Sequence, residues 1–149
     1  MRTAILILAL VSLNACRSVP EAPPEGRVTL AVTSVTHAWI EYEIHNGTDS
    51  AIKFDTVLQR PRVTQERLQD GAWVAVSSIG CGNGWAYEIL KPGQSFVSRL
   101  GVRERVKPTR LKLWICKPGS FDGYLQNGVA PGEAWPVASD PIPAFFKTP

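Results

Sequence analysis

The sequence has no apolar run long enough to cross a bilayer as a helix. Its longest run, residues 4–13, has ten residues, whereas a membrane-spanning helix needs about 20. Arg2 precedes this run, and small Ala15 and then Cys16 follow it. A short apolar segment between a positive charge and a small residue is typical of a secretion signal. We therefore expect residues 1–15 to be removed rather than to remain as a span.

The chain also lacks a strong charge of either sign. Sixteen Lys and Arg residues stand against 13 Asp and Glu residues, and loss of Arg2 with the signal leaves 15 against 13, a net charge of +2. A domain that binds nucleic acid is usually strongly basic. An exported protein would also rarely meet nucleic acid. We expect no nucleic-acid partner.

Catalytic and metal-binding motifs are scarce. Gly-x-Ser-x-Gly and Cys-x-x-Cys are both absent, and the two histidines, His37 and His45, have no nucleophile at motif spacing. The glycine-rich stretch at residues 81–84 lacks the Lys-Ser/Thr pair of a phosphate-binding loop. We therefore predict a protein that is not an enzyme and that uses no metal or cofactor.

The end of the apolar run, Leu13-Asn14-Ala15-Cys16, resembles the lipobox of bacterial lipoproteins. The resemblance implies cleavage before Cys16, lipidation of its sulfur and a stable membrane anchor, since two or three acyl chains hold a protein firmly. Because residue 17 is not the Asp associated with inner-membrane retention, it also implies an outer-membrane position facing the periplasm. The proline-rich residues 16–26 would then form an extended tether. The alternative is an ordinary signal peptide cut elsewhere, which would leave Cys16 as a free or mispaired thiol.

The remaining cysteines form an even pair once the lipid occupies Cys16. Cys81 and Cys116 would then lie in an oxidising compartment, and we predict a disulfide between them. It would close a loop of about 36 residues and stabilise the fold by roughly 3–4 kcal/mol. The alternative is a metal site that uses both thiolates with His37 and His45.

Alternating apolar residues predict β-strands with one buried face from residue 27 onward. The clearest cases are Ile40, Tyr42 and Ile44, and then Leu111, Leu113 and Ile115. Turn signals separate the alternating stretches: Asn46-Gly47 and Asp70-Gly71 suit tight hairpins, and Pro92-Gly93 suits a type II turn. The weak alternation at residues 63–69 leaves open one turn of helix around residues 64–68.

The order of strands, the Asn-Gly turn after a Tyr-x-Ile strand and the Leu-x-Pro-Gly-Gln-Ser turn before another strand resemble bacterial immunoglobulin-like or fibronectin-type modules. The likeness covers roughly residues 27–142. It implies an all-β fold, an immunoglobulin-like antiparallel β-sandwich of about seven strands with one disulfide, within a single domain at residues 27–149. This resemblance carries no active site with it.

Two sets of side chains are candidates for binding. The first is aromatic and comprises Trp85, Tyr124 and Trp135, which lie near loops and could stack on sugars or on a partner; core packing is the alternative for the tryptophans. The second lies in the basic segment 99–117, with a local net charge of +6, and comprises Arg103, Arg105 and Arg110. A solvated sheet face that guards an edge strand is the alternative there.

Together these patterns predict a non-catalytic lipoprotein anchored to the outer membrane. Its β domain would bind an envelope protein or support an envelope assembly. The alternative function is a glycan- or peptidoglycan-binding lipoprotein that uses Trp85, Tyr124 and Trp135.

Overall fold

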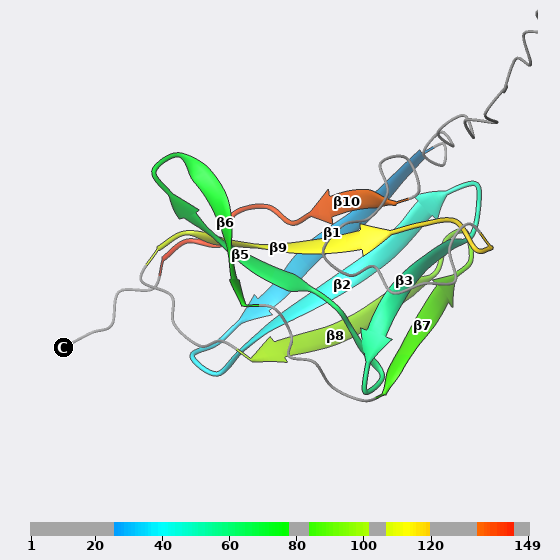
Figure 1. Ribbon diagram of the computed structural model, residues 1–149, viewed down its shortest axis with the longest axis horizontal. Helices are drawn as coiled ribbons and strands as arrows, with labels where there is room; N and C mark the ends of the chain where they lie inside the picture. The colour runs from blue at the N-terminus through cyan, green and yellow to red at the C-terminus, as the bar shows by residue number, and fades with distance from the viewer. Residues whose placement is uncertain (1–25, 78–83, 102–106, 120–133, 145–149) are drawn as a thin grey trace, which may run out of the picture.

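The computed structural model describes residues 26–77, 84–101, 107–119 and 134–144, and these form an all-β structure without a helix (Figure 1). Ten strands follow one another in these residues, where about seven were expected. They are β1 (Gly26–Val35), β2 (Trp39–Thr48), β3 (Ile52–Val57), β4 (Arg60–Pro61), β5 (Thr64–Gln69), β6 (Ala72–Ser77), β7 (Trp85–Leu90), β8 (Ser95–Gly101), β9 (Thr109–Ile115) and β10 (Trp135–Ala138).

The strands form three antiparallel sheets, in the orders β1-β2-β8, β10-β9-β5-β6 and β4-β3-β7. The second and third sheets are joined by a bridge between Lys53 of β3 and Cys116 just after β9. The Lys53 N–H donates to the Cys116 carbonyl at 2.7 Å, and the Cys116 N–H donates to the Lys53 carbonyl at 2.9 Å. This bridge makes the two sheets one continuous layer.

The hydrophobic core lies between the sheet β1-β2-β8 and this joined layer. The first sheet contributes the predicted stripe of β2, Ile40, Tyr42 and Ile44, all buried. The joined layer contributes, among others, Phe54 of β3 and the predicted stripe of β9, which comprises Leu111, Leu113 and Ile115. Residues far apart in the chain thus fill one core, an arrangement consistent with a β-sandwich.

The prediction of a hairpin turn at Asn46-Gly47 was wrong, because both residues lie inside β2 and pair with β1. Asn46 is fully buried, and its side chain satisfies the backbone around it. Its Nδ2 donates to the carbonyls of Ser50 and Leu90, both at 2.9 Å, and its Oδ1 accepts from the N–H and hydroxyl of Thr48. Gly47 is needed for close approach, since a Cβ there would lie 2.8 Å from the Arg27 carbonyl oxygen.

The other two turn predictions are confirmed. Asp70 and Gly71 have φ values of 51° and 81° and connect β5 to β6, as a two-residue hairpin with positive φ at both positions requires. Gly93 has a φ of 76°, and the Gln94 N–H donates to the Lys91 carbonyl across the turn. The alternative helical turn around residues 64–68 is excluded, because these residues form β5.

Replacing Asn46 with Ala should lower the free energy of unfolding by about 2–4 kcal/mol, because buried carbonyl and N–H groups would lose their partners. Asp49→Ala, three residues away and exposed, serves as the control and should change stability by less than about 0.5 kcal/mol. Urea unfolding followed by tryptophan fluorescence measures both. Equal, small effects for the two variants would contradict the structural role assigned to Asn46.

Candidate functional site

The sequence-predicted site residues fall into two groups. Cys16, Cys81, Arg103, Arg105 and Tyr124 lie outside the described residues. The others lie within the strands or just beside them: Trp85 begins β7, Arg110 lies in β9, Cys116 follows β9, and Trp135 begins β10.

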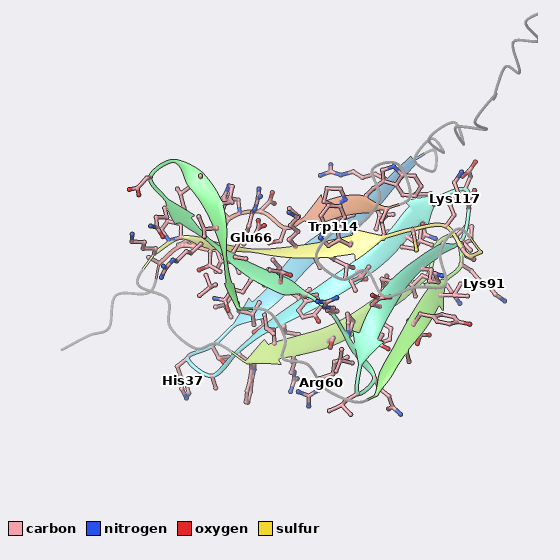
Figure 2. All side chains as sticks on the ribbon, viewed as in Figure 1. His37, Arg60, Glu66, Lys91, Trp114 and Lys117 are labelled. Atoms are coloured by element: carbon pink, nitrogen blue, oxygen red, sulfur yellow. The ribbon has the colours of Figure 1, made fainter. Side chains whose placement is uncertain are left out.

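Arg110 is held by an ion pair on the outer face of the sheet rather than projecting freely. Its Nε lies 2.7 Å from Oε2 of Glu66, and Nζ of Lys112 lies 3.3 Å from the other carboxylate oxygen. The Glu66 side chain is only 7% exposed. Figure 2 shows Glu66 on β5 beside the β9 strand that carries Trp114. Part of the positive charge of the basic segment is therefore neutralised by a carboxylate on the neighbouring strand β5, which lies 44 residues away in the sequence.

Two tryptophans extend this cluster across the sheet. The Arg110 guanidinium lies 4.6 Å from the centre of a Trp73 ring, and Nζ of Lys112 lies 5.0 Å from the centre of a Trp114 ring. Such cation–π contacts add to the ion pairs. The cluster of Trp73, Arg110, Glu66, Lys112 and Trp114 therefore holds its cations by two kinds of contact at once.

Of the three aromatic residues predicted to bind, Trp135 is the one whose side chain the structure describes. It is half-buried and packs against the main core cluster. Its position favours the core-packing alternative for this tryptophan. Trp39 is more open, with 43% of its surface exposed. The Arg99 guanidinium lies 5.4 Å from its ring centre and is also paired with Glu41.

Cys116 is buried, and its sulfur is bonded to no other described cysteine. Its Sγ lies 3.7 Å from the Lys53 carbonyl oxygen, and burial raises the pKa of the thiol. No disulfide is seen within the described part of the chain. Cys81 lies outside that part, so the predicted pairing stays a prediction.

β6 is the outermost strand of its sheet and carries no charged residue. Val74 and Val76 of this strand are 42% and 41% exposed. The hairpin of β5 and β6 projects from one end of the molecule (Figure 1). The sequence pattern indicated the hairpin but could not show which strand would lie at an edge.

A cavity of about 440 Å³ opens between the β3–β4 turn and β8. Arg60 brings a guanidinium group to it, Leu58 and Leu100 form apolar walls, and Arg99 and the buried Tyr42 also belong to the lining. Figure 2 labels Arg60 at this turn. Sequence reasoning missed this site, because three separate segments contribute to it and none contains a recognisable motif.

Metal-ligating side chains do not gather in the described residues: no group of three or more His, Cys, Asp or Glu is placed to hold an ion. His37 lies in the turn before β2, and His45 lies near the far end of that strand. Between Trp39 and His45 the strand rises by roughly 20 Å, at about 3.3 Å per residue. The two histidines therefore cannot share one metal ion.

Among the same residues there is no helix with the length and apolar character to span a membrane. Comparisons of the chain with models of protein families, with curated proteins and with solved structures find no match.

Removing the Glu66 carboxylate should be far more costly than removing that of Glu41. Both accept from an arginine Nε at 2.7 Å, but Glu66 is 7% exposed whereas Glu41 is 25% exposed and its Arg99 partner 62%. Glu66→Ala leaves two cations without their partner and should lower stability by about 3 kcal/mol.

The matched control, Glu41→Ala, breaks an exposed pair and should cost no more than about 1 kcal/mol. Chemical denaturation of both variants measures the difference. If the two substitutions cost the same, burial does not govern the strength of these pairs, and the cluster around Glu66 has no special structural weight.

Proposed function

We propose that this protein is a non-catalytic lipoprotein of the bacterial envelope, anchored by lipid on Cys16 to the outer membrane and facing the periplasm. The support for the anchor is the sequence Leu13-Asn14-Ala15-Cys16 after a short apolar run, together with the proline-rich residues 16–26 that follow. The β domain beyond this tether is proposed to bind an envelope protein.

We further propose that the domain is an immunoglobulin-like sandwich with one disulfide between Cys81 and Cys116. The antiparallel sheets around one core support the first part. The second part is supported by the position of Cys116 directly after β9, where a covalent link would fix the end of that strand.

The observation that carries the binding proposal is the edge of β6, which pairs with no further strand among the described residues. Exposed edge strands can pair with another chain, and proteins commonly block them with charges or proline. Every other outer strand of the described sheets carries such a residue: Arg27 in β1, Arg60 and Pro61 in β4, Glu88 in β7, Arg99 in β8 and Pro136 in β10. β6 has none.

An extended segment of a partner could therefore add to the sheet beside β6. Main-chain hydrogen bonds would supply affinity, and alternate side chains would supply specificity. The exposed Val74 and Val76 favour apolar or β-branched residues in that segment, because these would bury the valine side chains. The proposed partner is an envelope protein with such an extended segment.

The fates of the three cysteines test the anchor and the disulfide. Peptide mass mapping without reductant should find diacylglyceryl-modified Cys16 at the mature N-terminus and a peptide pair linked through Cys81 and Cys116. Cys16→Ala should move the protein from the membrane to the soluble fraction. An unmodified Cys16, or two free thiols at positions 81 and 116, would refute the corresponding part of the proposal.

Photo-crosslinking in intact cells tests the binding edge. A photoreactive residue at the exposed position of Ala72 should give one adduct with an envelope protein. Val74→Lys should abolish it, because the lysine places a charge in the new strand pair. Val97→Lys is the matched control: Val97 is 60% exposed on β8, and its substitution should leave the adduct unchanged.

Three other outcomes would count against this function. An adduct with cell-wall glycan would favour the glycan-binding alternative. An adduct only with a second copy of the chain would make β6 a self-association edge. Equal effects of the two lysine substitutions would show that β6 is not the binding edge.

A further inference from the structure

The cavity between the β3–β4 turn and β8 combines positive charge with apolar walls. Its volume of about 440 Å³ falls in the range of roughly 300–1,000 Å³ that is usual for small-molecule sites. Val57 and Leu58 approach from one side and Leu100 from the other, while Arg60 supplies the charge. The site is thus large enough for a short peptide end or a similar small molecule.

The two arginines differ in how far they are neutralised. Arg99 donates from Nε to Glu41 at 2.7 Å, and its guanidinium also lies 5.4 Å from the centre of the Trp39 ring. Arg60 is exposed and forms no ion pair within the described residues. Among the described residues of the lining, Arg99 is balanced by Glu41, so Arg60 leaves a local charge of +1. The site therefore matches a ligand with a single negative charge.

Tyr42 adds a neutral polar group to the lining. It is 1% exposed, and it lies opposite Ser98 of β8. Burial raises the pKa of the phenol, an effect that the side chain of Ser98 and the positive charge of Arg60 only partly offset. The phenol is therefore uncharged at neutral pH and adds no negative charge that would repel an anion.

The apolar wall of the cavity is formed by a strained turn. Leu58 and Gln59 have φ values of 51° and 62°, in the left-handed region that is costly for such residues. Leu58 is nevertheless 73% exposed. Its N–H donates to the Gly84 carbonyl at 3.2 Å, and a Cβ at Gly84 would lie only 3.0 Å from its Cδ2. Contacts with residue 84 thus hold an apolar side chain in the open at the rim, where a ligand could cover it.

We propose that this cavity binds a singly charged carboxylate attached to a short aliphatic group, as found at the C-terminus of a peptide that ends in a small apolar residue. The guanidinium group of Arg60 would hold the carboxylate, because its planar pair of N–H donors matches the two oxygens of a carboxylate. Leu58, Val57 and Leu100 would cover the aliphatic part. A phosphate dianion would exceed the local charge of +1. This site is independent of β6 and of the function proposed above.

Titration of the purified full chain with acetyl-Ala-Val as the free acid tests the proposal, with its C-terminal amide as the matched control ligand. The fluorescence of Trp39, whose ring is stacked by Arg99 at 5.4 Å, should change as the acid binds. We expect saturation in roughly the millimolar range or below, with binding at least tenfold weaker for the amide. Because the attraction is electrostatic, added salt should weaken binding of the acid.

Arg60→Gln should weaken binding of the acid about tenfold, because it removes the guanidinium that is free to pair with the ligand. Arg67→Gln is the matched control, since Arg67 is an exposed arginine on β5 that does not line the cavity. Circular dichroism checks that both variants fold. The comparison of acid with amide uses the unaltered chain, so it stands even if a variant does not fold.

Four results would overturn the proposal: no saturation by the acid, equal binding of acid and amide, equal effects of the two arginine substitutions, or tighter binding of butyl phosphate than of the acid. Acetate tests the apolar walls, since binding as tight as that of acetyl-Ala-Val would mean that the aliphatic part makes no contact. These titrations do not depend on the crosslinking experiment at β6. The cavity proposal and the proposed function can therefore fail separately.

Discussion

The structure depends on the buried hydrogen bonds of Asn46, which tie β2 to the segments that enter and leave the opposite layer. Its side chain bonds to the Ser50 carbonyl before β3 and to the Leu90 carbonyl at the end of β7. Its main chain bonds to Gln94 and Gly93 in the turn before β8. One residue thereby satisfies backbone groups that burial would otherwise leave without partners.

The main-chain bonds between Asn46 and the turn before β8 also set the register in which β8 pairs with β2. With Ser95 opposite His45, Arg99 comes opposite Glu41 and Leu100 opposite Ile40. The first pairing produces the ion pair with Glu41, and the position of β8 brings Arg99 and Leu100 to the cavity beside Arg60. A shift of one residue would turn each of these side chains to the other face of the sheet.

The basic segment shows why charge counts along a chain mislead. Arg99 and Arg110 lie close together in sequence. Each is paired with a carboxylate on a neighbouring strand that is far away in the sequence, Glu41 for Arg99 and Glu66 for Arg110. The first pair is largely exposed and the second largely buried, so the same chemical pairing has different energetic weight. In the described part of this segment, the positive charge without a carboxylate partner is therefore smaller than the sequence indicated.

The sequence by itself determined the local features of this protein. Alternation at Ile40, Tyr42 and Ile44 and at Leu111, Leu113 and Ile115 predicted the buried faces, because side chains of a strand point to opposite sides in turn. Asp70-Gly71 predicted its hairpin because the conformational freedom that this turn needs belongs to those two residues themselves.

Tertiary structure decided everything that depends on distant partners. Asn46-Gly47 has the same turn chemistry as Asp70-Gly71, yet pairing with β1 and the buried bonds of Asn46 keep it in a strand. The partners of Arg110, the exposed edge of β6 and the cavity at Arg60 likewise arise where segments separated by tens of residues meet. Local sequence patterns carry no information about which distant segments will be neighbours in the fold. The same strand can lie in the centre or at the edge of a sheet, depending on what packs beside it.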